Sequence, residues 1–111
     1  MISRESGEHY VWGDACDGWH LVKADTLSVI EERIPPQRHE TPHKHLKARQ
    51  FFYVLRGEAV LDVDGTRHCL LAGQGLEVAP GQGHTMRNET DADLEFLVVS
   101  NPPTKRDRVP A

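Results

Sequence analysis

Residues 41–59 read TPHKHLKARQFFYVLRGEA, a stretch in which two histidines one residue apart precede a long apolar run. Side chains alternate between the faces of a β-strand, so His43 and His45 project from one face at the separation that two ligands of one metal ion need. Gln50 follows after the interval LKAR, which can turn the chain and leave the amide near the same point. This stretch therefore predicts a metal site carried by strands.

A further candidate ligand lies later in the chain. His84 stands in APGQGHTMRN, where it begins another predicted strand after a glycine-rich loop. Imidazole nitrogens with an oxygen donor suit iron, manganese, nickel, copper, cobalt or zinc, and the donor set does not separate these divalent ions. The alternative for His43 and His45 is a pair of surface histidines on an edge strand, and Gln50 could instead hydrogen-bond a loop.

Short apolar runs recur between turn signals at intervals of about ten residues, the spacing expected of an antiparallel β-sandwich or barrel. Asp64-Gly65 favours a tight hairpin, because this pair readily adopts positive φ angles. No long window has the periodicity of a helix. The predicted fold is all-β, with strands over 19–22, 27–34, 50–55, 59–63, 66–70, 76–79, 84–87 and 94–99.

The composition narrows the range of functions. A length of 111 residues suits one domain, and 13 basic against 17 acidic side chains give a net charge of −4 with both signs scattered. We therefore expect neither nucleic acid nor a membrane as partner. The start, MISRESGEHYVWGD, lacks a secretory signal, so we expect a soluble, cytoplasmic protein. Cys16 and Cys69 are far apart, and we expect both to be buried reduced thiols.

The strand over 50–55 is apolar on both faces. Phe52 and Val54 share a side with Gln50, and the opposite side carries Phe51, Tyr53 and Leu55. Such a strand lies either between two sheets or against another subunit. In so short a chain we favour the subunit contact, which predicts a homodimer.

Two spacings together resemble a known family. His43-x-His45-x4-Gln50-x6-Gly57 closely resembles the first motif of the cupin superfamily, and Gly73-x5-Ala79-x-Gly81-x2-His84-x3-Asn88 resembles the second. The resemblance implies one small cupin domain over 1–111, with motifs at 43–57 and 73–88 and an extended or frayed tail at 101–111. It implies a double-sheet jelly-roll β-barrel. A divalent transition metal inside its open mouth would be held by His43, His45, Gln50 and His84.

The sequence departs from the family pattern at three places. Ala79 replaces a proline of the second motif, a change that concerns the turn. Gln50 stands where most metal-binding cupins have glutamate, so the ion keeps its full charge and should prefer an anionic ligand. The same glutamine makes the chain similar to small cupins that process unsaturated uronates from pectin and alginate. An acidic residue expected on their last strand is missing from LVVS at 97–100.

Several residues outside the ligand set are candidates for other roles. We expect Asn88 to close a turn and the remaining histidines to be ordinary surface groups or neighbours of the ligands. Glu77 and Tyr53 are the candidates for an acid or base, although no catalytic residue follows from the sequence. A substrate carboxylate could meet Lys47, Arg49 and Arg87. The predicted pocket is lined by Phe52, Val54, Leu61 and Met86.

The leading expectation is a metal-dependent enzyme that polarises a carbonyl or enol oxygen of a small, anionic, sugar-derived substrate, as an isomerase or tautomerase does. One alternative is a non-haem metal dioxygenase, since a histidine-rich site in an apolar pocket can bind an enolate and oxygen. The other alternative is a non-catalytic module that binds a small ligand or a metal.

Overall fold

A computed structural model describes residues 1–111, and the chain folds into two antiparallel sheets without any helix. None of its elements is therefore a helix that could cross a membrane. The strands are β1 (Glu8–Trp12), β2 (Cys16–Lys23), β3 (Ser28–Ile34), β4 (Arg38–His39), β5 (His43–His45), β6 (Arg49–Arg56), β7 (Glu58–Val63), β8 (Thr66–Leu71), β9 (Gly75–Val78), β10 (His84–Asn88), β11 (Leu94–Asn101) and β12 (Arg108–Pro110).

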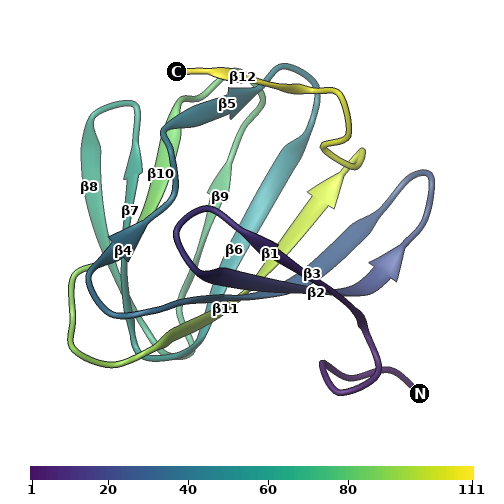
Figure 1. Cartoon of the computed structure of the whole chain (residues 1–111). Helices are drawn as coiled ribbons and strands as arrows, with labels where there is room; N and C mark the ends of the chain where they lie inside the picture. Colours follow the sequence, from purple (N-terminus) through teal and green to yellow (C-terminus); the bar gives the residue numbers. More distant parts are fainter.

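The two sheets lie face to face and enclose the core between them (Figure 1). The first sheet has the order β1-β2-β3-β11-β6-β9, and the second has the order β12-β5-β10-β7-β8. The C-terminal segment crosses one end of the molecule and pairs as β12 with β5, which carries the paired histidines. The tail predicted as an extended or frayed segment is thus a strap held in a sheet.

The all-β fold predicted from the sequence is confirmed, and each predicted strand is present with somewhat different bounds. The strands β1, β4 and β12 were not predicted. They are two to five residues long, too short to carry a repeated apolar pattern, and their backbone hydrogen bonds are made with neighbouring strands.

The register of the first sheet fixes which side chains share the interior. Gln50, Ser100 and Ser28 form one row across β6, β11 and β3, and Val54, Phe96 and Glu32 form a row further into the barrel. Successive inward side chains on one strand belong to successive rows, because their period is two. The polar row and the row with Glu32 therefore lie on the same face, one apolar row apart.

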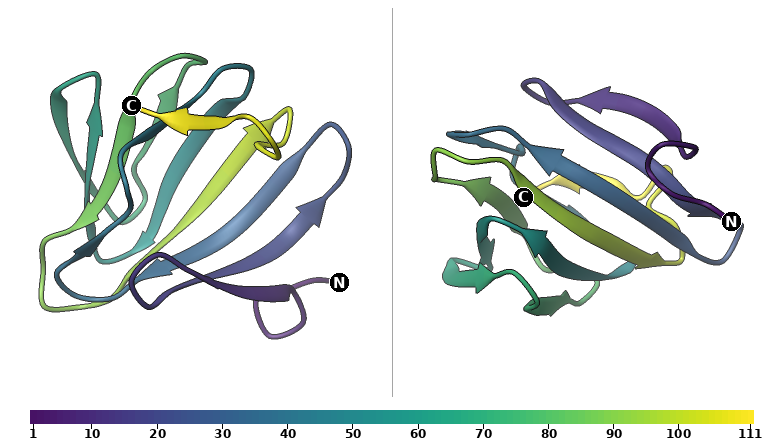
Figure 2. Two further views of the ribbon diagram at one scale, coloured as in Figure 1. Left: turned by 45° about the horizontal axis from the view of Figure 1, so that its top comes forward. Right: turned by 90° about the horizontal axis from the view of Figure 1, so that it is seen from below.

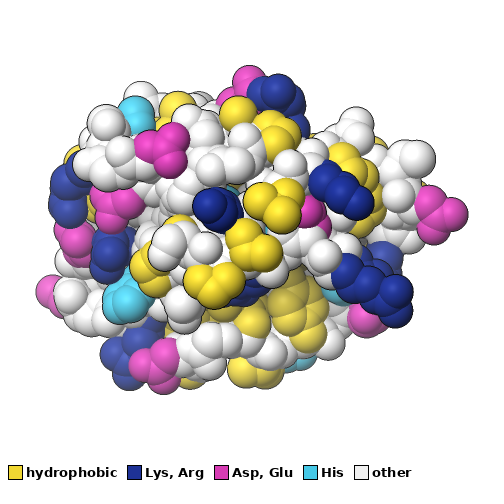
Figure 3. Space-filling view, turned by 90° about the horizontal axis from the view of Figure 1, so that it is seen from above, with side chains coloured by type: hydrophobic (Ala, Val, Ile, Leu, Met, Phe, Trp, Pro, Cys, Tyr) yellow, Lys and Arg dark blue, Asp and Glu magenta, His cyan; other side chains and the backbone are white.

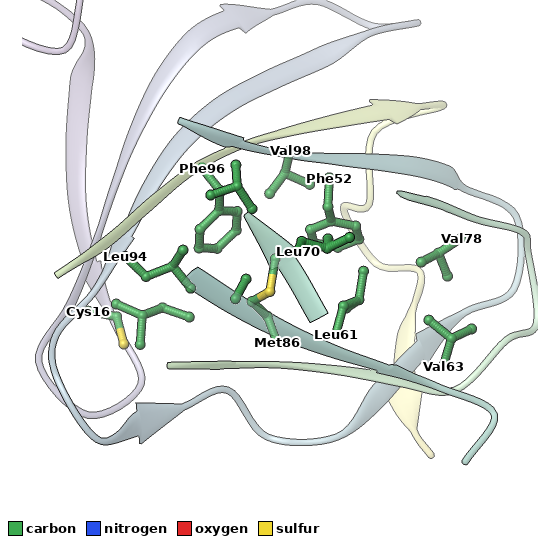
Figure 4. Packing of buried hydrophobic residues seen from close by; sticks show 13 residues of the cluster. Cys16, Phe52, Leu61, Val63, Leu70, Val78, Met86, Leu94, Phe96 and Val98 are labelled. Atoms are coloured by element: carbon green, nitrogen blue, oxygen red, sulfur yellow. The ribbon is translucent and has the colours of Figure 1, made fainter. Parts of the chain in front are cut away.

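A cluster of 13 buried apolar side chains fills the space between the sheets (Figure 4). Phe96, Ile34, Leu61 and Met86 are completely buried, and each contributes about 1.5–3 kcal/mol by leaving water. Asn88 lies at the edge of this cluster, where its amide donates to Ile34 O and Ala92 O and its oxygen accepts from Thr90. Its predicted role in closing a turn is confirmed.

The two cysteines differ in burial. Cys16 is buried and Cys69 is exposed, so the prediction of two buried thiols was wrong for Cys69. Leu70 on β8 faces the core, and its neighbour Cys69 must therefore face outward.

On the surface seen from above, side chains of both charges are scattered around a group of hydrophobic ones (Figure 3).

Candidate metal centre

Three histidines from two neighbouring strands meet inside the barrel. His43 and His45 lie on β5, and His84 lies directly opposite His43 on β10. Each histidine has a ring nitrogen that lies within 4.8 Å of a ring nitrogen of both other histidines. All three residues are buried. The ring centroids of His43 and His84 are 4.4 Å apart, and those of His43 and His45 are 4.9 Å apart. The predicted convergence of these imidazoles is present.

Backbone carbonyls orient two of the three rings. Nδ1 of His43 donates to Thr41 O at 2.8 Å, and Nδ1 of His84 donates to Gln82 O at 3.1 Å. A ring that donates from Nδ1 in its neutral form keeps the lone pair on Nε2, which is the usual arrangement of a metal-binding histidine. The Nε2 atom of His84 is buried without a hydrogen-bond partner, as is Nδ1 of His45.

Gln50 lies on the inner face of β6, beside the histidines. Phe52, two residues further along the same face, has its ring centroid 5.6 Å from that of His84. The Gln50 amide nitrogen donates to Ser100 Oγ at 3.1 Å, while its oxygen Oε1 is buried without a partner. A buried acceptor left unpaired is costly, and a bound cation would satisfy it. The unpaired atoms of His45, Gln50 and His84 and the ring of His43 in the same cluster fit the predicted divalent ion.

The histidines are also kept neutral. Burial lowers the pKa of His43 to about 4, although its hydrogen bond to the Thr41 carbonyl acts in the opposite direction. Burial likewise lowers the pKa of His45 and of His84. Only a neutral imidazole can bind a metal, so the barrel interior holds all three rings in the binding form at neutral pH.

Asp107 fixes the loop between the two histidines of β5 and Gln50. Its carboxylate accepts hydrogen bonds from the backbone N–H groups of Leu46, Lys47 and Ala48 at 2.9–3.1 Å. Burial opposes the charge of Asp107, but these donors outweigh it and lower its pKa. The strap therefore sets the path of the four residues that bring Gln50 to the histidines, and the sequence had not indicated this role.

Most of the chain matches a known protein family. Residues 30–100 match the family described as Cupin domain, Cupin_2, and this segment makes up more than half of the chain. The protein is a member of the Cupin_2 family. The resemblance of its two motifs to cupins is confirmed, and its three-histidine cluster is compatible with the metal that cupins hold.

Individual cupins resemble it in sequence or in fold. The oxalate-binding protein of Thermotoga maritima is 33% identical over 67 residues, which cover 60% of this chain and 55% of that protein. The structure of KdgF from Halomonas sp. superposes with a TM-score of 0.85 over 93% of each chain at 14% identity. An RmlC-like cupin from Shewanella frigidimarina gives a TM-score of 0.85 at 21% identity and covers 96% of this chain and 93% of its own. These two structures show the fold alone.

Two side chains proposed as an acid or base lie on the wrong face of the cupin barrel. Tyr53 stacks on Phe51 on the outer face of β6, and Glu77 is exposed and paired with Arg49. Both alternate with the inward residues of their strands, which explains the error. Arg49 and Arg87 are engaged by Glu77 and Asp62, so neither is a free cation beside the ligands.

The predicted pocket residues belong to the packed core. Val54, Leu61 and Met86 are completely buried within the apolar cluster, and Phe52 lies at its boundary with His84. None of the four borders the hollow of about 760 Å³ that is lined by residues of the β2–β3 hairpin and by residues 102–105. The ribbons of these two segments lie side by side in the left view of Figure 2. Their role in lining a ligand pocket stays a prediction.

Two carboxyl groups in the interior were not predicted from the sequence. Glu32 on β3 accepts a hydrogen bond from the Tyr10 hydroxyl at 3.0 Å, and Glu40 accepts one from the Met86 amide at 2.9 Å. Burial raises the pKa of Glu32 to about 7, and burial together with the charge of Glu32 raises that of Glu40 to about 8. Glu32 could have been found, since it lies at even spacing from the inward residues Ser28 and Ile34 and therefore shares their face of β3.

Proposed function

We propose that this cupin is a metal-dependent enzyme that polarises a carbonyl or enol oxygen of a small anionic, sugar-derived substrate and promotes its isomerisation or tautomerisation. The observation that carries the proposal is the buried cluster of His43, His45 and His84 beside the unpaired oxygen of Gln50. A divalent ion bound there would act as a Lewis acid toward an oxygen of the substrate. The chain's own residues supply the ligands and exclude water.

The charge of the site supports an anionic substrate. Three neutral imidazoles and an amide leave the charge of a divalent ion uncompensated, and a carboxylate ligand would supply the missing negative charge. Arg108, on the strand paired with His45, adds positive charge, and that charge helps to lower the pKa of His43 and His84. The relative from Thermotoga maritima is named for binding oxalate, which is a small dianion.

That name also favours a second candidate, a cupin that binds an anion at its metal without catalysis. The match spans 55% of the oxalate-binding protein, and oxalate binding by this chain is likewise a proposal. Both candidates require the metal, but only the first converts its ligand into a product.

The test begins with elemental analysis of untagged protein and of the His45→Ala variant, with Lys44→Ala as a matched control on the same strand. We expect the wild type and the control to carry close to one divalent ion per chain and His45→Ala to carry little. Equal metal content in all three proteins would overturn the assignment of the site.

Turnover is measured next on a panel of unsaturated uronates and ketoses, with metal-loaded and metal-free protein side by side. Metal-dependent conversion supports the isomerase, whereas anion binding without conversion supports the binding module. Oxygen consumption by the iron-loaded protein would replace both with the dioxygenase. Conversion that is equal with and without metal would refute the proposed role of the ion.

A further inference from the structure

Tyr10 and Glu32 form a hydrogen-bonded pair where the interior of the barrel meets the hollow of about 760 Å³. Tyr10 borders the hollow, and its hydroxyl donates to Oε2 of Glu32 at 3.0 Å. A Cβ atom at Gly18 would lie only 2.2 Å from Cζ of Tyr10, so the ring rests directly on the backbone of β2. The absence of a side chain at this glycine is what allows the tyrosine to reach the glutamate.

We propose that Tyr10 and Glu32 form a proton relay that exchanges one proton with an anionic ligand bound in the hollow. The inference deepens the proposed function and rests on it, because isomerisation or tautomerisation requires a group that gives and takes a proton. No residue of the metal cluster needs to play that part.

The transfer balances with one proton and no other reactant. When Glu32 is protonated, it donates to the phenolic oxygen, and the hydroxyl hydrogen of Tyr10 is free to point into the hollow. Transfer moves that hydrogen to the ligand and the Glu32 proton to the phenolic oxygen. Tyr10 stays neutral, Glu32 becomes a carboxylate, and the reverse steps take a proton from the ligand.

The hollow has the chemistry to hold an anion next to the relay. Lys105 and Thr104 stand on one wall, and His20, on the other, has a buried Nδ1 without a hydrogen-bond partner. The ring of His20 lies 5.1 Å from that of Tyr10. Lys23 and Asp25 border the same hollow, and Lys23 is paired with Glu8.

Two serines lie between the hollow and the predicted metal ligand Gln50. Ser28 lines the hollow and lies opposite Ser100, whose Oγ accepts the hydrogen bond from the Gln50 amide. The inner face of the first sheet is therefore polar from the hollow to the predicted metal ligand.

The surroundings of Glu32 suit a group that changes its protonation near neutrality. Tyr10 contacts it from β1, Glu40 adds a second carboxyl group from the segment between β4 and β5, and the charge of Arg108 acts on it from β12. Cys16 on β2 is the other titratable group beside it. Burial raises the pKa of Glu32 to about 7, while the hydrogen bond from Tyr10 and the charge of Arg108 lower it.

The first test titrates the glutamate side chains of the complete, zinc-loaded protein by ¹³C carboxyl NMR, with oxalate as the probe anion. We expect a signal that is lost in Glu32→Gln to titrate near pH 7. Tyr10→Phe should raise its midpoint because a hydrogen bond to the carboxylate is lost, and oxalate should raise it in the wild type by adding negative charge nearby. Tyr53→Phe, which removes a hydroxyl on the outer face, should leave the midpoint unchanged. The relay is overturned if Tyr10→Phe or oxalate leaves the midpoint in place.

The second test measures deuterium exchange into the methyl group of pyruvate, a probe whose enolisation needs a proton-transfer group. Relative to the metal-loaded wild type, Tyr10→Phe and Glu32→Gln should slow the exchange by about 100-fold or more while pyruvate affinity changes little. Variants that exchange at the wild-type rate would overturn the relay. Wild-type exchange no faster than that of metal-free protein would instead count against the proposed function, and the titration would still decide whether the pair senses a bound anion.

Discussion

Gln50 sets the charge of the candidate metal centre, because its side chain is a neutral amide where a glutamate would carry a negative charge. Its nitrogen is used by Ser100, and its oxygen is unpaired and buried. A carboxylate at this position would offer a similar oxygen and would also cancel one unit of the ion's charge. The amide therefore leaves room for an anionic ligand to complete the compensation.

Replacing this amide by a carboxylate should strengthen binding of the metal and weaken binding of an anion to the metal-loaded protein. We expect Gln50→Glu to tighten binding of a divalent ion by about tenfold or more and to weaken oxalate binding to the metal-loaded protein by a similar factor, about 1.4 kcal/mol each. The Ser100 hydroxyl, which accepts from the Gln50 amide, can instead donate to the new carboxylate, so the fold should persist. Calorimetric titrations with manganese and then oxalate measure both changes. Gln74→Glu, an exposed replacement of the same kind, should change neither, and tighter oxalate binding in Gln50→Glu would contradict the charge argument.

Glu40 should make the stability of the protein depend on pH. Its pKa rises from the ordinary 4.5 to about 8 on folding, first through burial and then through the charge of Glu32. The folded state therefore holds the proton more tightly, and stability is fully present below about pH 4.5 and is lost as the pH rises toward 8. Each unit of difference in pKa corresponds to about 1.4 kcal/mol.

The variant Glu40→Gln keeps the oxygen that accepts the Met86 amide and removes the ionisable proton. Its free energy of unfolding should fall less steeply than that of the wild type between pH 5 and 8, and at pH 8 the variant should be the more stable protein. Chemical denaturation at a series of pH values measures this. Glu58→Gln, at an exposed position, should follow the wild type, and parallel curves for Glu40→Gln and the wild type would refute the prediction.

At the scale of elements, the C-terminal strap is part of the metal centre although it supplies no ligand. β12 pairs with β5, and Asp107 just before it binds the three amides that follow His45. The spacing between His45 and Gln50 is visible in the sequence, but the shape of the loop between them is set by a residue about 60 positions away.

Loss of the Asp107 carboxylate should loosen the loop and weaken metal binding. We expect Asp107→Ala to raise the dissociation constant of the divalent ion by about 10–100-fold, the usual effect of removing a group that orients metal ligands. Asp107→Asn keeps one acceptor oxygen and should fall between that variant and the wild type. Competition with a chelator measures the constants, and Asp25→Ala on the exposed β2–β3 turn is the control. An unchanged constant for Asp107→Ala would show that the loop holds its shape without the strap.

Features that depend on local spacing could be predicted from the sequence, whereas contacts between distant segments could not. The long strands and the inward positions of His43, His45 and Gln50 follow from local spacing and alternation, which are visible in a single stretch. Glu77 and Tyr53 were named as an acid or base without support from a motif, and alternation along their strands puts both on the other face. The pairing of Tyr10 with Glu32 depends on three strands in register and on Gly18, and no local pattern encodes such a contact.

At the scale of the whole molecule, the outer face of the first sheet is unusually apolar for a surface. Phe51 lies beside Val99, and Tyr53 lies beside Leu97, on the neighbouring strands β6 and β11. Phe51 remains 42% exposed, and a shallow hollow of about 500 Å³ beside it is bordered by Arg49 and Glu77. An apolar centre with a charged rim is the usual anatomy of a protein interface.

We propose that a second copy of the chain covers this face through a two-fold axis, because one self-complementary patch suffices for a closed dimer. Light scattering after size exclusion should give a mass near twice 12.5 kDa at micromolar concentration. Phe51→Lys should yield monomers, since a stable interface of roughly 800 Å² per subunit cannot bury an unpaired ammonium group at its centre. Val11→Lys, at an exposed position on the edge strand β1 of the same sheet, should remain dimeric. A monomeric wild type, or a dimer that survives Phe51→Lys, would show that this face is not where two chains meet.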